Sequence, residues 1–131
     1  MARLRVELLD RVEEFACKAL DVAEAMEMKG ISRRLVDQIA AASTSVGANV
    51  FEADEAMSRA DFVKCLAIAT KELSEVRFWV RIAVKRGWVS GQKAGPVLTE
   101  GVELRRIFGT MIVRTKKGSP YGSKSSQATA S

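Results

Sequence analysis

Carboxylate and amide side chains on two predicted helices are the first candidates for chemistry. Asn49 and Glu52 lie three residues apart and share a helical face, and Glu75 lies on the next helix. A carboxylate pair can transfer protons or hold a divalent cation. The chain has no histidine, however, which excludes Ser-His and Cys-His nucleophile pairs and every His-containing metal site.

We therefore expect a structural role for these three residues, with ligand binding and acid–base catalysis as the alternatives. In the structural interpretation, Asn49 and Glu52 fasten their helix to the next one through Lys71 or Arg77. The Glu-x-x-His motif of di-iron bundles cannot occur without histidine. The expected protein is not an enzyme and carries neither a metal nor a cofactor.

Basic residues gather in the second half of the sequence. Residues 1–57 hold 7 bases and 11 acids, whereas residues 58–131 hold 14 bases and 5 acids, for a net charge of +5. The candidate nucleic-acid-binding residues are Lys64, Lys71, Arg77, Arg81, Lys85, Arg86, Arg105 and Arg106. Such a face favours RNA or DNA as a partner, contacted through its phosphates. The alternatives are an acidic surface on another protein and a solvated face neutralised by nearby acids.

Two tryptophans are candidates for contacts between subunits. Trp79 lies beside the apolar seam formed by Val76 and Val80, so we expect it at the edge of the buried stripe. Edge tryptophans often anchor interfaces. Trp88 follows shortly after the same helix. Burial in the core and stacking on nucleic-acid bases are the alternatives, although stacking usually needs an exposed platform.

Four amphipathic helices must position these residues. Apolar residues recur every three or four positions over residues 4–29 and again over residues 58–86, which is typical of helices packed on helices. Glycines typical of helix ends and serines typical of helix starts separate the segments, namely Gly30, Gly87, Ser32 and Ser58. The pattern predicts an all-α, up-down-up-down four-helix bundle with antiparallel neighbours.

The links between the helices carry their own signals. Residues 40–49 are nearly all small, which predicts a bend or a close helix crossing near Gly47. Residues 52–57 are expected to form an acidic link or a frayed helix end. We expect a loop over residues 87–95, with Pro96 in the first turn of the fourth helix.

Composition sets the domain boundaries and the compartment that we expect. The bundle should span residues 1–116, followed by a flexible tail over residues 117–131 that is poor in apolar residues. No segment approaches the roughly 18–20 apolar residues of a membrane span, and acids occupy the place of a signal-peptide core. We therefore expect a cytoplasmic protein without a membrane partner. Cys17 and Cys65 lie in apolar helical contexts and are expected to be buried free thiols.

The run from Gln38 to Glu75 resembles the small four-helix bundle proteins called ribosomal-RNA intervening-sequence proteins. After a Gln in helix two, that family has a Ser-Ile-Pro-Ala-Asn-Ile-Ala-Glu-Gly run. The corresponding run here is Ser45-Val46-Gly47-Ala48-Asn49-Val50-Phe51-Glu52-Ala53. The family's later Ser, Glu-Phe pair, Ile-Ala pair, Glu and Gly-Tyr-Leu-Ser resemble Ser58, Asp61-Phe62, Ile68-Ala69, Glu75 and Gly87-Trp88-Val89-Ser90.

The resemblance covers about residues 5–115 and has identifiable departures. Gly47 replaces the family proline, Ala53 replaces the last glycine of the run, and Glu72 stands where Ser or Thr is usual. The resemblance implies a structural role for the motif residues Gln38, Ser45, Asn49, Glu52, Phe62 and Glu75.

The resemblance also implies partners. Some family members assemble as rings of five, so a homo-oligomer, with a pentamer favoured, is the expected state. Some genes of the family lie within intervening sequences of 23S ribosomal RNA, and a related group serves reverse transcriptases of diversity-generating retroelements through a basic surface. The expected function is a non-enzymatic oligomeric bundle that binds RNA or DNA, with a reverse transcriptase as a further partner. The alternative is a purely structural or protein-interaction scaffold.

Overall fold

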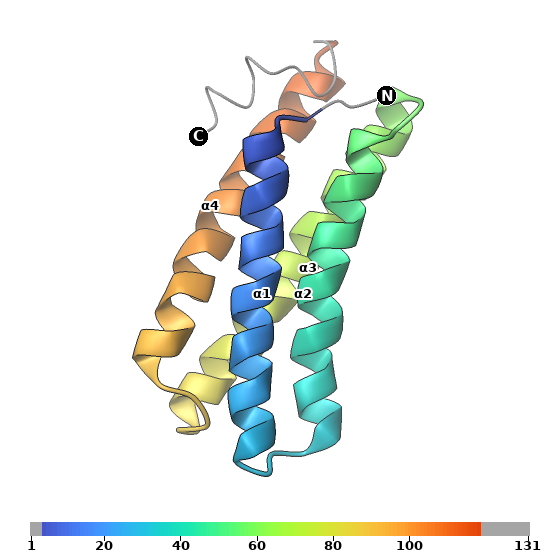
Figure 1. Ribbon diagram of the computed structural model, residues 1–131. Coiled ribbons are helices and arrows are strands. Elements are labelled where there is room, and N and C mark those ends of the chain that lie inside the picture. Colours follow the sequence, from blue (N-terminus) through green and yellow to red (C-terminus); the bar gives the residue numbers. More distant parts are fainter. Residues whose placement is uncertain (1–3, 119–131) are drawn as a thin grey trace.

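The chain forms four α-helices in the computed structural model, which describes residues 4–118 (Figure 1). The helices are α1 (Val6–Met28), α2 (Arg33–Asp54), α3 (Arg59–Lys85) and α4 (Gly91–Lys116). Successive helices run antiparallel and pack side by side, and α1 also contacts α4 (Figure 1). Residues 4–118 contain no strand. The predicted all-α bundle is therefore confirmed.

Two glycines end helices, as their positions in the sequence predict. Gly30 has φ of 76° and Gly87 has φ of 72°, a left-handed conformation that side chains rarely adopt. After α3, the Trp88 N–H donates to the Ala83 carbonyl over 2.8 Å, and the Gly87 N–H donates to the Val84 carbonyl over 3.0 Å. This pair of bonds is a Schellman motif, which satisfies carbonyls that the helix itself leaves free.

Of the two serines expected to cap helices, Ser58 makes the capping hydrogen bond and Ser32 does not. The Ser58 hydroxyl accepts from the Asp61 N–H over 3.1 Å, which confirms the predicted cap of α3. Ser32 occupies the corresponding position of α2, but its side chain makes no capping bond. Ser32 is therefore the N-cap residue of α2, as predicted, but it does not stabilise the helix through a capping hydrogen bond.

The start of α4 differs from the prediction. Residues 91–95 belong to the helix rather than to a loop, and Pro96 lies inside it rather than in its first turn. The reason is a cap upstream, because the Ser90 hydroxyl accepts from the Lys93 N–H over 3.1 Å. Pro96 then costs one intrahelical bond, since its nitrogen cannot donate to the carbonyl four residues earlier.

The apolar stripes of all four helices face one core. The stripes predicted for α1 and α3 are buried throughout, and the largest fully buried side chains include Phe15, Phe62, Phe108, Met26 and Ile39. A bidentate ion pair joins α1 to α4, because the Arg11 guanidinium donates to both Glu100 carboxylate oxygens over 2.8 Å. Such forked pairs fix geometry as well as charge.

The small residues of α2 let α1 approach. A Cβ built on Gly47 would lie 3.6 Å from Val12 Cγ1, an ordinary van der Waals distance. Ala48, the next residue, is exposed, and α2 runs unbroken to Asp54. The predicted close crossing is therefore an approach of α1 at Gly47, and the first residues of the expected acidic link form the last turn of α2.

The predicted tail over residues 117–131 falls almost entirely outside the described residues. Lys117 and Gly118 form a turn after α4. None of the helices within residues 4–118 combines the length and hydropathy that a bilayer crossing requires.

Candidate nucleic-acid interface

The outer side of α3 carries a row of exposed side chains, here called the α3 row. Its members are Lys64, Lys71, Phe78, Arg81 and Lys85, and all are exposed. Four of them are spaced seven residues apart, close to two helical turns, so they lie nearly above one another. The row extends about 32 Å from Lys64 to Lys85 at 1.5 Å per residue.

The basic residues of the α3 row form no ion pair with an acid within residues 4–118. Neither their charged groups nor those of Arg77 and Arg105 form an ion pair or hydrogen bond with another described residue. Two other candidate nucleic-acid-binding residues, Arg106 and Arg86, do contact neighbouring side chains. Arg106 pairs with Glu103 over 3.1 Å, and the Arg86 guanidinium lies 6.0 Å from the centre of the Trp88 ring. Six of the eight predicted bases therefore make neither an ion pair nor a cation–π contact within residues 4–118, although Lys71 interacts electrostatically with the neighbouring Glu72.

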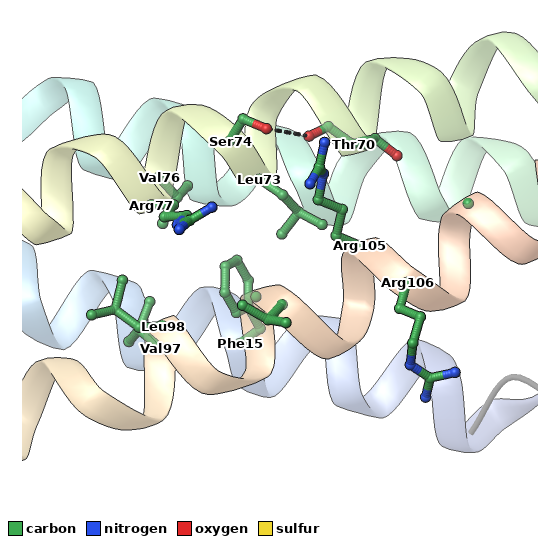
Figure 2. Close-up of a pocket in the computed structure, with 13 residues that line it drawn as sticks. Phe15, Thr70, Leu73, Ser74, Val76, Arg77, Val97, Leu98, Arg105 and Arg106 are labelled. Carbon is green, nitrogen blue, oxygen red and sulfur yellow. Dashed lines mark hydrogen bonds between the residues drawn. The ribbon is translucent and has the colours of Figure 1, made fainter.

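A groove lies beside this row, between α3 and α4, and is here called the α3–α4 groove (Figure 2). Its volume is about 590 Å³. Apolar side chains dominate the lining, with Phe15 of α1 reaching it from below; the others are Leu73, Val76, Val97, Leu98 and Val102. Arg77 flanks the groove from α3 and Arg105 from α4, whereas Arg106 points away from it (Figure 2).

The two tryptophans of the predicted interface are both half-buried against the core. Phe78, next to Trp79, is the exposed aromatic residue, with 56% of its surface accessible. The two rings meet edge to face, with centroids 5.2 Å apart and planes at 77°. Phe78 belongs to the same aromatic group as the two tryptophans, and its seven-residue spacing from Lys71 and Lys85 is the sequence signal that places it among the basic residues.

A sequence model for a family described as 23S rRNA-intervening sequence protein matches residues 5–110. The chain belongs to the 23S rRNA-intervening sequence protein family. A solved structure from Bacteroides thetaiotaomicron, described as a protein with unknown function from the S23 ribosomal protein family, is 27% identical with a TM-score of 0.75. The match covers 79% of this chain and 96% of that one. A comparison with curated proteins finds no match.

The motif residues of the 23S rRNA-intervening sequence family lie on α2 and α3, and Glu52 joins the two helices. Asn49 donates to the Ser45 carbonyl over 2.9 Å and lies 3.2 Å from the Ser45 hydroxyl, so its amide bonds within α2. Glu52 contacts α3 through the Cys65 thiol, with 3.9 Å between sulfur and oxygen. The expected link through Lys71 or Arg77 is replaced by these contacts. Phe62 is fully buried, and Gln38 is half-buried.

Two half-buried carboxylates of α3 lie one turn apart on its α2 side. Burial and the neighbouring Glu75 raise the pKa of Glu72 above its usual 4.5. Two carboxylates alone make a weak cation site. Within residues 4–118, no three acidic or cysteine side chains come together in a way that could hold a metal ion.

The two thiols of this 23S rRNA-intervening sequence protein differ in environment. Cys17 is exposed and Cys65 is half-buried, so the expectation that both are buried is wrong for Cys17. Cys17 lies on the outer side of α1, next to the buried stripe that suggested burial. Burial and the neighbouring Glu52 and Asp61 carboxylates raise the pKa of the Cys65 thiol above its usual 9.0.

Alkylation should therefore distinguish the two cysteines. At pH 8, we expect iodoacetamide to modify Cys65 more slowly than Cys17, because Cys17 is exposed, whereas burial hinders access to Cys65 and raises its pKa, which lowers the population of the nucleophilic thiolate. Peptide mass spectrometry over time gives both rates. Glu52→Gln should accelerate the reaction at Cys65 and leave Cys17 unchanged. Equal rates in the unmodified protein would contradict this prediction.

Proposed function

We propose that this chain is a non-enzymatic, self-associating helical bundle that binds RNA or DNA through bases on α3 and α4. The observation that carries the proposal is the α3 row, whose basic residues form no ion pair with an acid within residues 4–118. Arg81 and Lys85 lie one helical turn apart, so their like charges repel one another, and an anionic polymer relieves that repulsion.

The dimensions of the row support a polymeric partner over a small anion. Its length of about 32 Å is close to the 34 Å of one turn of B-DNA. Arg77 and Arg105 add charge beside the row and widen the face across the α3–α4 groove. Contacts of this kind bind phosphates and carry no sequence information.

The partners follow from the same chemistry. A cytoplasmic location is proposed with this ligand, because RNA and DNA are accessible there. A reverse transcriptase, which itself handles nucleic acid, is the proposed protein partner, in line with the resemblance to accessory proteins described above. Neither catalysis nor a cofactor is needed for this function.

The test is fluorescence anisotropy with a labelled oligonucleotide at 50 mM and 200 mM salt. We expect binding at the lower salt and a fall in affinity with log salt, with a slope of about −0.7 to −0.9 per phosphate contact. Undetectable binding at 50 mM salt would contradict the proposal.

A protein-interaction scaffold is the second candidate, and a second groove favours it. This groove lies between α1 and α2 and is lined by acids and by half-exposed Phe51; the acids are Asp10, Glu13 and Glu14. Its charge complements the α3–α4 face of another copy, so chains could associate head to tail. We expect light scattering at micromolar concentration to report a mass several times that of one chain. The mass of a single chain would contradict self-association.

A further inference from the structure

We infer that Phe78 and the α3–α4 groove receive unpaired nucleobases, so that the chain binds single strands in preference to duplexes. The inference rests on the proposed nucleic-acid function and names the class of nucleic acid. Phosphate contacts alone favour the more densely charged duplex, so a preference for single strands must come from groups that contact nucleobases.

Phe78 is placed to stack on a base. It is 56% exposed, yet it lies in a row whose other members are all charged. Lys71 and Lys85 lie seven residues on either side, about 10.5 Å along the helix. Trp79 contacts Phe78 edge to face, which limits the directions that the Phe78 ring can adopt. Proteins that bind single strands use this arrangement, in which an exposed and oriented aromatic ring lies between basic side chains that contact phosphates.

The groove beside it has the size and chemistry of a site for flat, polar-edged rings. Its volume of about 590 Å³ lies within the usual range for ligand sites. The guanidinium groups of Arg77 and Arg105 flank the apolar lining from opposite helices and have no acidic partner within residues 4–118 (Figure 2). Guanidinium planes stack on bases as well as pairing with phosphates.

Hydroxyl groups add hydrogen-bonding capacity on the α3 side of the groove. The Thr70 hydroxyl donates to the Leu66 carbonyl over 2.9 Å, so its lone pairs are left to accept from a base amino group. Ser74, which also lines the groove, lies one turn before Phe78. The groove and the aromatic ring are therefore neighbours on one face.

A glycine of α4 offers a place to test the groove. Gly109 lines it, and a Cβ built on this residue would meet no atom within 4 Å. A larger side chain at this position would therefore occupy the groove without a clash at its first carbon. Leucine and alanine both favour helix over glycine, so Gly109→Ala is a matched control for Gly109→Leu.

A duplex cannot use these features. Its bases are stacked and paired, so it contacts the α3 row only through phosphates. A single strand adds base stacking, which is far less sensitive to salt. The preference should therefore appear as an affinity difference between the two forms that persists as salt rises.

The experiment compares a labelled single-stranded DNA of mixed sequence with its duplex by anisotropy at 50 mM salt. We expect tighter binding of the single strand. Phe78→Leu and Gly109→Leu should each weaken single-strand binding about 5- to 100-fold and leave duplex binding unchanged, since stacking acts on unpaired bases. Phe78→Trp and Gly109→Ala should retain the preference. Circular dichroism confirms that each variant is folded.

The outcomes separate the inference from the proposed function. Equal affinity for the two forms, or variants that weaken both forms equally, would overturn the inference and leave phosphate binding in place. If Phe78→Leu and Gly109→Leu change the affinity for neither form, the inference is likewise overturned and phosphate binding remains. Failure to bind either form at 50 mM salt would overturn both proposals.

Discussion

Replacing Phe15 with alanine should lower the free energy of unfolding by about 3–5 kcal/mol. Phe15 is 2% exposed, and its ring lies at the base of the α3–α4 groove. A Cβ built on Gly101 of α4 would lie 3.6 Å from that ring, so α4 packs directly over it. Removal of the ring leaves a cavity that three helices surround and that their backbones cannot fill. Urea denaturation followed by circular dichroism measures the change.

Phe78→Ala is the matched control for this prediction. It removes the same side chain from an α-helix, but Phe78 is 56% exposed, so the change should stay within about 1 kcal/mol. A Phe15→Ala variant as stable as Phe78→Ala would show that Phe15 is not a core residue.

Neutralising three bases of the α3 row should abolish most nucleic-acid binding at moderate salt. In the variant Lys71→Gln, Arg81→Gln and Lys85→Gln, each substitution removes one phosphate contact. The magnitude of the salt slope should fall by about 2 to 3, because each contact contributes about 0.7 to 0.9. Single strands and duplexes of any sequence should be affected, since phosphates carry no base information. Stability should change little, because exposed charges contribute little to it.

The control changes net charge equally at other surfaces. Lys18→Gln, Arg34→Gln and Lys93→Gln also remove three exposed bases, from α1, α2 and the start of α4. This variant should keep the salt slope of the unmodified protein. Equal losses in both triple variants would mean that binding follows net charge and that the α3 row is no specific site.

The sequence by itself determined the helices and their buried faces. The seam of α3 from Phe62 to Ala83 is buried throughout, as its spacing predicts. Spacing suffices there because an apolar stripe at helical period can leave water only by packing against other stripes. Gly30 and Gly87 were equally predictable, since a left-handed residue at a helix end is a local requirement that glycine meets best. The family motif between Gln38 and Glu75 identified the same bundle.

The first residue of α4 could be predicted only approximately from the sequence. Pro96 favoured a helix start, but the cap at Ser90 begins the helix earlier. The proline and the serine cap are both local signals, and they favour different helix starts. The helix includes Pro96 because the loss of one backbone hydrogen bond costs less free energy than an uncapped first turn near residue 96. Sequence alone does not rank two such signals.

The candidate site was decided by the tertiary structure. Adjacent residues on a helix point about 100° apart, so the packing of α2 and α4 against α3 decides that Trp79 is half-buried and Phe78 exposed. The same packing opens the α3–α4 groove and brings Arg77 and Arg105 to its two sides. Pairing is likewise a matter of geometry, because Arg106 reaches Glu103 whereas Arg105, one residue earlier, reaches no acid within residues 4–118. Sequence sets which residues are basic, but the distances between helices decide which charges remain for a partner.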